Sequence, residues 1–212
     1  MKGMIALFIL ALTFLIGVSV FVIAQNKELT AHLDKGWNLV AGFNSIETIS
    51  NGDITQSNIK AVYGFYSPAQ VYVRIYPQPE IDKKNSLEAT YAVDGDIISY
   101  SAVWVYSDKI GTLNYMPDFE VSLERLSLYK GWNFVPITSE MIGKTLSEVK
   151  GNCELMKAYG YSTDGGGQWI DVLNNNLKLN FDIENTGLVI KVSNKCKLLG
   201  SSGTPQIPQL PN

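Results

Sequence analysis

The sequence predicts a mainly β protein: two tandem homologous β-rich domains, each a small sandwich or barrel with at most one short helix, after an N-terminal hydrophobic helix. Three observations support this prediction. The stretch LDKGWNLV at residues 33–40 returns as LYKGWNFV at residues 128–135, about 95 positions later, which indicates a duplicated fold. Tyr, Trp, Val and Ile are plentiful between regularly placed Gly and Pro residues, as in strands joined by turns. The segment before residue 25 is apolar and uncharged after Lys2.

The repeated phrase contains the residues that we expect to anchor each copy. Glycine adopts positive φ without steric cost, so Lys-Gly predicts a tight turn between strands. Tryptophan is a large apolar anchor, and we expect both copies to bury it at equivalent positions. Asparagine can satisfy nearby backbone groups in the turn. The predicted anchors are Gly36, Trp37, Asn38, Gly131, Trp132 and Asn133.

Three further blocks match in the same order. Residues 61–67 are similar to 157–162, residues 71–75 correspond to 169–173, and residues 103–109 correspond to 189–195. Four blocks in one order argue against chance convergence and extend the repeat over nearly the whole chain after residue 28.

On these motifs the chain resembles the Gly-Trp-Asn-Leu-Ile/Val ("GWNL") repeat modules of archaeal and bacterial secreted and cell-surface proteins. The shared features are the Gly-Trp-Asn turn, a Tyr in the middle of each repeat and an aromatic-Trp-Val closing strand. The second copy departs from this pattern, because Val189-Ile190 stands where the first has Val103-Trp104. The resemblance implies a β-rich extracellular module and supplies no catalytic residues.

The first 24 residues are expected to be a signal peptide or a membrane anchor, and three interpretations are open. Val22-Ile23-Ala24 before Gln25 is typical of a signal-peptide cleavage site. The apolar stretch 4–24 is also long enough to span a bilayer as an uncleaved helix. Lys2-Gly3 before Met4 would suit a type IV pilin-like leader. All three interpretations place the rest of the chain outside the cytoplasm.

The first domain is expected at residues 28–115. Residues 29–33 alternate like a strand, residues 55–60 suit one helical turn, and 59–65 with 70–76 form a hairpin. Residues 77–86 are expected to be a polar excursion. Asp94-Gly95-Asp96 predicts a second hairpin between 91–93 and 97–100, before a closing strand at 103–106. Residues 113–121 are expected to join the two copies.

The second domain is expected at residues 122–199. Residues 145–151 predict a short capped helix ended by glycine. Residues 162–167 read as a loose hairpin loop, 174–176 as a turn and 177–183 as a half-buried strand. Residues 200–212, which contain three prolines, are expected to be a Pro-rich disordered tail.

Both cysteines, Cys153 and Cys196, fall in the second copy. An even count in an exported chain favours a disulfide, with two separate buried thiols as the alternative. Closing a loop of that length can contribute about 4 kcal/mol on the chain-entropy account, as a local reinforcement of one domain.

The composition offers little support for catalysis or for metal binding. The formal net charge is −3 and no basic run exists, which disfavours a nucleic-acid partner. His32 is the only histidine, and its place on the polar side of residues 29–33 predicts a solvated position. Gly52-Asp53 and Asp94-Gly95-Asp96 lack calcium-loop spacing and are taken as turns. We therefore expect no cofactor, no metal and no enzyme activity, although acids distant in sequence can meet in space.

Aromatic residues are the remaining candidates for function. A flat exposed aromatic face would suit stacking on sugar rings or on a protein partner, whereas the same residues could simply fill two small cores. The candidates for such a face are Tyr66, Tyr72, Trp104 and Tyr106.

The sequence thus predicts an exported, non-enzymatic cell-surface or secreted structural or binding protein. Its expected partners are the cell envelope, another extracellular protein or a glycan, with membrane contact only through residues 4–24 if they are retained. Two alternatives are a pilin-like filament subunit or membrane-tethered assembly protein, and a carbohydrate-binding module.

Overall fold

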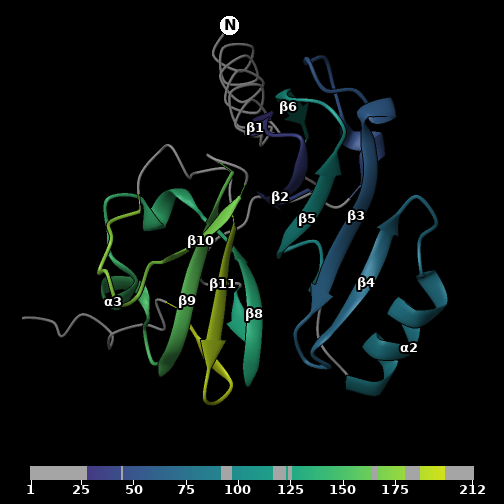
Figure 1. Ribbon diagram of the computed structural model, residues 1–212. Helices are drawn as coiled ribbons and strands as arrows, with labels where there is room; N and C mark the ends of the chain where they lie inside the picture. The colour runs from purple at the N-terminus through teal and green to yellow at the C-terminus, as the bar shows by residue number, and fades with distance from the viewer. Residues whose placement is uncertain are drawn as a thin grey trace, which may run out of the picture.

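The computed structural model describes residues 28–43, 45–91, 97–116, 123, 126–163, 167–179 and 187–198. These residues form a mainly β protein of antiparallel sheets, as predicted (Figure 1). No sheet closes into a barrel in this part of the chain, so the barrel alternative is wrong. The predictions for residues 1–24 and for the tail at 200–212 lie outside the described residues. Among the residues described, no helix is long and apolar enough to cross a bilayer.

The first half of the chain forms a four-stranded sheet and a two-stranded sheet. The larger sheet has the order β2 (Gly36–Ala41), β5 (Ala102–Ser107), β3 (Ile59–Tyr66) and β4 (Val71–Tyr76), and β1 (Leu29–Leu33) pairs with β6 (Gly111–Tyr115). Alternation along β2 and β5 sends Val40 and Val105 inward, where they join Leu33 and Leu113 in one buried core. The smaller sheet therefore covers one face of the larger one.

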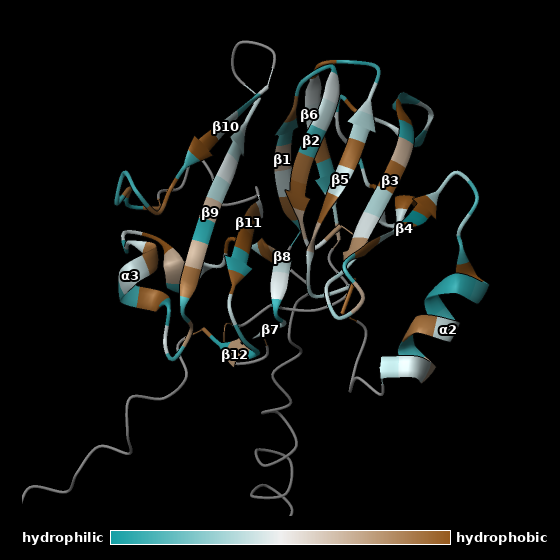
Figure 2. Cartoon of the chain, turned by 60° about the horizontal axis from the view of Figure 1, so that its bottom comes forward, coloured by the Kyte–Doolittle hydropathy of each residue, from teal (hydrophilic) through white to brown (hydrophobic). Residues whose placement is uncertain are grey.

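The second half repeats this plan. Its four-stranded sheet has the order β8 (Gly131–Pro136), β11 (Gly187–Val192), β9 (Leu155–Ser162) and β10 (Gln168–Asp171), and β7 (Ser127–Leu128) pairs with β12 (Cys196–Lys197). Val135 and Ile190 point into a core that also contains Leu146 and Val149 of α3 (Leu146–Val149). Figure 2 shows α2 (Ile81–Tyr91) beside the first large sheet and α3 beside the second.

The strand registers identify equivalent positions in the two large sheets. Leu39 pairs with Trp104 as Phe134 pairs with Val189, so Trp104 and Val189 are equivalent. Phe65 pairs with Tyr72 as Tyr161 pairs with Trp169, so Tyr72 and Trp169 are equivalent. The sequence comparison aligned both blocks one residue away from this register. Because a one-residue slip moves a side chain to the opposite face of a strand, the correction changes which residues face outward.

The glycine and asparagine of the repeated phrase have the predicted roles. Gly36 and Gly131 have φ of 113° and 99°, a region that favours glycine. Asn38 is 2% exposed, accepts a bond from the Asp34 N–H at 2.9 Å and donates to the Asp34 and Gly36 carbonyls at 2.9 and 3.0 Å. Asn133 is equally buried and makes the same three bonds with Tyr129 and Gly131.

The prediction that both tryptophans are buried is wrong. Trp37 is 42% exposed and Trp132 is half-buried. Asn38 and Asn133 occupy the inward positions beside them, so alternation along the strand turns both indoles to the outer face. The residues that fix the turn are therefore the asparagines.

The capped helix expected at residues 145–151 and the helical turn expected at residues 55–60 both form. Thr145 and Glu148 make a capping box at the start of α3, and the Thr145 N–H bond lowers the pKa of the Glu148 carboxyl. A one-turn helix at Gln56–Asn58 has the same kind of box with Thr55.

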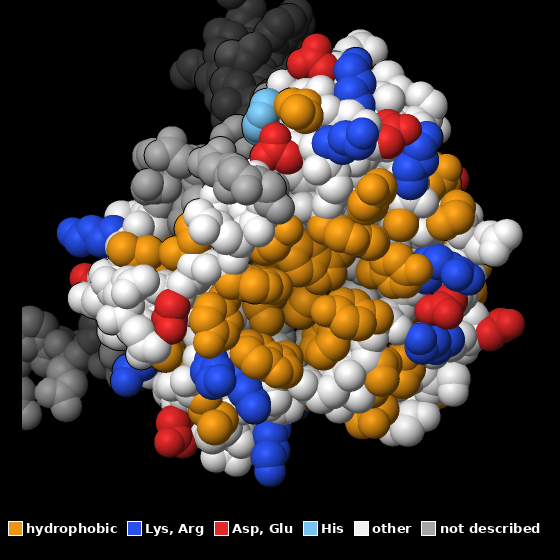
Figure 3. Space-filling model, viewed as in Figure 1, with side chains coloured by type: hydrophobic (Ala, Val, Ile, Leu, Met, Phe, Trp, Pro, Cys, Tyr) orange, Lys and Arg blue, Asp and Glu red, His pale blue; other side chains and the backbone are white. Residues whose placement is uncertain are grey.

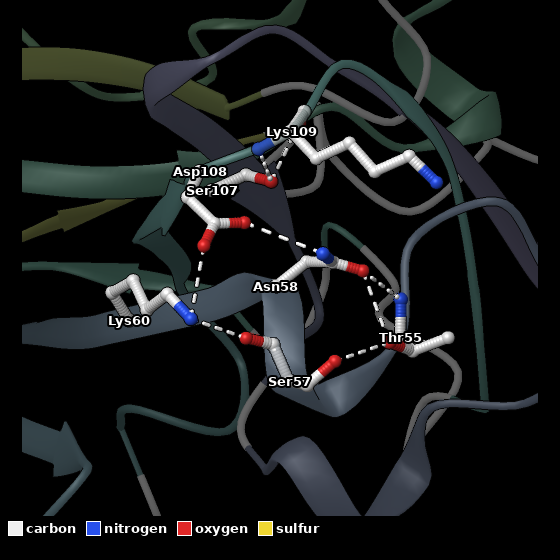
Figure 4. Close-up of polar contacts among 7 residues, drawn as sticks. All are labelled: Thr55, Ser57, Asn58, Lys60, Ser107, Asp108 and Lys109. Carbon is white, nitrogen blue, oxygen red and sulfur yellow. Dashed lines mark hydrogen bonds and ion pairs between the residues drawn. The ribbon is translucent and has the colours of Figure 1, made fainter.

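Figure 4 shows how the one-turn helix at Gln56–Asn58 is tied to the turn after β5. Asn58 donates to Asp108 at 3.3 Å, and the Lys60 ammonium lies 2.9 Å from the other Asp108 oxygen. The Lys60 bond lowers the pKa of the Asp108 carboxyl. Both side chains of the pair are well exposed, so the pair contributes little to stability.

Helix α2 (Ile81–Tyr91) was not predicted. It has no fully buried residue, and it is attached by Leu87, which packs partly buried against the first core, together with polar contacts. Glu80 accepts from the Arg74 N–H at 2.9 Å, and Lys83 donates to the Tyr72 carbonyl at 2.7 Å, which covers the outer edge of β4. The sequence places a polar excursion and then a strand here, because no apolar periodicity marks the helix.

Three further expectations change. Tyr91 ends α2 and residues 97–100 form a turn, so the hairpin around Asp94-Gly95-Asp96 is wrong, although 92–96 lie outside the described residues. Residues 113–115 belong to β6 and are not part of a linker. Of the strand expected at 177–183, the described part forms a single bridge between Lys178 and Thr145.

Cys153 and Cys196 form a disulfide, as the sequence predicts, with Cα atoms 5.1 Å apart. The bridge joins the segment before β9 to β12, 43 residues later. It closes the core of the second half beside α3.

Replacing either buried asparagine should destabilise the protein. Asn38→Ala and Asn133→Ala each remove three hydrogen bonds and leave buried backbone groups unpaired, which should cost about 1–3 kcal/mol. Chemical denaturation measures the free energy of unfolding. The exposed Asn175→Ala is the control and should stay within about 0.5 kcal/mol of the wild type. Near-neutral values for both buried asparagines would contradict their role in the turn.

Candidate functional site

The outer faces of the two large sheets contact each other. A small apolar cluster joins them, made of Leu39, Phe65 and Ala102 from the first sheet and Phe134 and Val189 from the second. Gly187 at the start of β11 lies so close to the first sheet that an added Cβ would be 2.2 Å from the Ala102 Cβ. The sheets therefore meet most tightly where their side chains are smallest.

Aromatic rings continue this contact away from Gly187. Phe65 and Phe134 stack with ring centroids 4.8 Å apart and an interplanar angle of 19°. Trp104 packs edge-on against Tyr161 at 4.9 Å and against Trp169 at 5.7 Å. Such pairs add about 0.5–1.5 kcal/mol each beyond their buried area. The rings therefore fix the two sheets relative to each other.

Beyond these rings the sheets leave an open hollow, here called the aromatic cleft. It has two adjoining parts of about 680 and 500 Å³, which share Tyr72 and Trp169. Figure 3 shows a continuous apolar surface in this region, between the two sheets. The lining residues are Trp37, Tyr63, Phe65, Gln70, Tyr72, Trp104, Trp132, Phe134, Tyr159, Tyr161, Trp169 and Val189.

The cleft is apolar and accessible. Trp37, Tyr72 and Trp169 are 42%, 47% and 52% exposed, so three large aromatic side chains on this face contact solvent. None of the described lining residues is charged. A clustered, exposed apolar surface of this kind marks an interaction site more often than an inert surface.

The hydrogen-bonding side chains of the cleft are mainly those of tyrosine and tryptophan. A tyrosine hydroxyl can donate and accept, and an indole N–H only donates. The hydroxyls of Tyr63, Tyr72 and Tyr159 make no hydrogen bond within the part of the chain that the structure describes. The cleft can therefore pack against flat apolar groups and donate hydrogen bonds to acceptors such as carbonyl oxygens.

Gln70 is the one non-aromatic polar residue of the lining, and its amide is already bonded. Its side-chain oxygen accepts from the backbone N–H of Trp132 at 2.7 Å, and its Nε2 donates to the backbone carbonyls of Trp132 and Ser67 at 2.8 and 2.6 Å. β8 is an edge strand of the second large sheet, which leaves backbone groups on one side of it unpaired. Gln70 satisfies two of these groups, the N–H and the carbonyl of Trp132. The bonds also join the first half of the chain to the second.

The four residues predicted for an aromatic face have different outcomes. Tyr72 and Trp104 line the cleft, and Tyr106 packs edge-on against Trp37 at 5.1 Å. Tyr66 is 0% exposed and lies in the first core, so its assignment to the face is wrong. On β3 the outward positions are Tyr63 and Phe65, which places Tyr66 inward.

Trp169, Tyr159 and Tyr161 complete the cleft and were not predicted. Each is equivalent by register to a residue of the first sheet that also faces the cleft, namely Tyr72, Tyr63 and Phe65. For Trp169 the signal was present in the repeat, but the off-by-one alignment paired it with Val71 and concealed it. Tyr159 and Tyr161 were already aligned with Tyr63 and Phe65.

No group of three potential metal ligands among His, Cys, Asp and Glu occurs in the described regions. His32 is exposed on β1, as predicted. The Asp53 carboxylate accepts from the Thr112 N–H at 3.3 Å and so fastens a turn. Burial raises the pKa of the Tyr115 phenol, which donates to the Ala41 carbonyl inside the first core.

Comparison of this chain with protein-family models, with curated proteins and with solved structures finds no match.

Substitution of Gly187 should disturb the contact between the sheets. Gly187→Ala places a Cβ 2.2 Å from the Ala102 Cβ and 2.9 Å from the Leu39 Cγ, so the sheets must separate. We expect a loss of about 1–3 kcal/mol in the free energy of unfolding, as for other overpacked sites.

Gly160→Ala is the matched control for this change. Its nearest neighbours would be Val172 and Leu188 at 3.5 and 3.8 Å, an ordinary contact. Its free energy of unfolding should be unchanged or higher by up to about 1 kcal/mol. Equal stability of the Gly187 variant and the wild type would contradict a tight contact between the sheets.

Proposed function

We propose that this chain is an exported, non-enzymatic binding protein of the cell surface or extracellular space, and that it binds its partner in the aromatic cleft. The observation that carries the proposal is the gathering of exposed aromatic side chains from both sheets around one uncharged hollow. A soluble protein seldom leaves such a surface open unless a partner covers it. The partner class is a component of the cell envelope.

We further propose that the two halves are homologous modules that arose by duplication. The repeated phrase, the same strand order in both large sheets and the same three asparagine bonds support this. Each module places its outer face against that of the other. One module alone would provide half of the cleft.

Export is expected to leave a defined N-terminus. Val22-Ile23-Ala24 before Gln25 suits signal-peptide cleavage, so the intact mass of the natively exported protein should correspond to a chain that starts at Gln25. A start at Met4 would establish the pilin-like route, and retention of residues 4–24 in the membrane fraction would establish the tethered one. Protein that starts at Met1 and stays in the cytoplasm would contradict export altogether.

Binding to the envelope should depend on the cleft. Tyr72→Ala and Trp169→Ala each remove an exposed ring, and loss of a central aromatic anchor should weaken binding by about 2 kcal/mol, roughly 30-fold. Sedimentation with envelopes isolated from the source cells measures the apparent dissociation constant. Envelopes stripped of glycan, compared with envelopes stripped of protein, then identify the bound component.

The control for this experiment is Ile110→Ala. Ile110 is 58% exposed but does not line the cleft, so its truncation should leave envelope binding unchanged. Equal binding by all three variants and the wild type would exclude the cleft as the binding surface.

A further inference from the structure

The residues after the second core contain a regular pattern. Pro205, Pro208 and Pro211 recur every third residue within the stretch TPQIPQLP at 204–211. A polyproline II helix has three residues per turn, so prolines at this spacing lie along one edge of it. Ile207 and Leu210 then lie along a second edge, and Gln206 and Gln209 along the third. The segment thus has two apolar edges and one polar edge in that conformation.

The aromatic cleft matches such a segment chemically. Grooves lined by aromatic rings bind polyproline II segments, because proline rings pack flat on the aromatic faces and little backbone entropy is lost. Proline has no N–H, so the three prolines of the segment present carbonyl acceptors without a backbone donor. The cleft offers donors from Tyr and Trp side chains, including Tyr72 and Tyr159 hydroxyls that have no hydrogen bond in the described chain.

Charge matches as well. Residues 200–212 contain no Asp, Glu, Lys or Arg, and the described lining of the cleft is also uncharged.

The segment is long enough to reach. Cys196 pairs with Leu128, and four residues lead from Leu128 to Trp132 in the cleft. Chain connectivity therefore keeps Leu198 within about 26 Å of Trp132. The ten residues from Leu198 to Pro208 span about 33–36 Å when extended, so the prolines can enter the cleft of their own chain.

We propose that residues 204–211 bind in the aromatic cleft of the same chain as a polyproline II segment. The prolines and the Ile207 and Leu210 side chains pack on the rings, and the glutamines face water. A tether of this length gives an effective concentration on the order of millimolar, so an intrinsic dissociation constant below that value keeps the cleft occupied. An envelope partner then has to displace the segment. The inference goes beyond the proposed function, because it assigns an occupant to the cleft and does not depend on the envelope partner.

All four tryptophans of the chain line the cleft, so their indole N–H signals report on it alone. We would place a nitroxide spin label on Gln209→Cys in the full chain, on the edge that faces water, with the Cys153–Cys196 disulfide intact. Bound residues 204–211 should abolish the indole signals closest to the label in the nitrogen-15 spectrum. Reduction of the nitroxide should restore these signals.

The labelled variant P205A/P208A/P211A is the matched control, with the same length and charge. It should keep all four indole signals, while its signals outside the cleft coincide with those of the wild type. Full indole signals in the labelled wild type, or the same loss in the proline variant, would overturn the proposal. Signal loss only when label and isotope are on different chains would show binding between molecules and would also overturn it.

The two proposals fail separately. If residues 204–211 do not occupy the cleft, the proline variant and the wild type bind envelopes equally, and both still depend on Tyr72 and Trp169. If the cleft does not bind the envelope, the spin-label result is unaffected.

Discussion

The contact between the outer faces of the two large sheets is the constraint on which the rest of the structure depends. Each sheet already buries one face against its own core, so an apolar outer face would be left in water if it stood alone. Phe65, Phe134 and Val189 are removed from water only because the opposite sheet covers them. The two halves thus complete each other, and Gln70 adds polar bonds across the same boundary.

Much of this arrangement could be predicted from sequence, because it depends on local patterns. Gly36 and Gly131, the capping box at Thr145 and the hairpin at 59–76 all carry short-range signals. The register of the strands carries no such short-range signal, because it depends on pairing between strands that are distant in the sequence. A shift of one position in two blocks hid Trp169, and assigning Trp37 to a core overlooked the asparagine that takes the inward position. Helix α2 escaped prediction for a related reason, since Leu87 and polar bonds to the edge of β4 attach it without an apolar period along the helix.

The shape of the cleft follows from a gradient of side-chain size along the facing strands. Ala41 and Ala102 are paired at one end of the first sheet, and Gly187 is opposite Pro136 at the same end of the second. Backbones can approach closely there, as the position of Gly187 shows. Towards the Lys-Gly turn, the side chains at the outward positions of β2 and β8 become larger. On β2 the next two outward residues are Leu39 and Trp37, and on β8 they are Phe134 and Trp132.

The two sheets contact through small residues at one end and large residues at the other. A uniform separation would either overlap the large side chains or leave voids between the small ones, so the sheets must diverge. The indole rings at the wide end cannot all be buried by the opposite sheet, which is why Trp37 and Trp169 remain exposed while Phe65 and Phe134 stack on each other between the sheets. The exposed aromatic surface is thus a consequence of how the two sheets meet. A sequence with small residues at the tryptophan positions would allow the sheets to close into an ordinary sandwich and would lose the cleft, whereas a side chain at Gly187 would force the sheets apart at their close end.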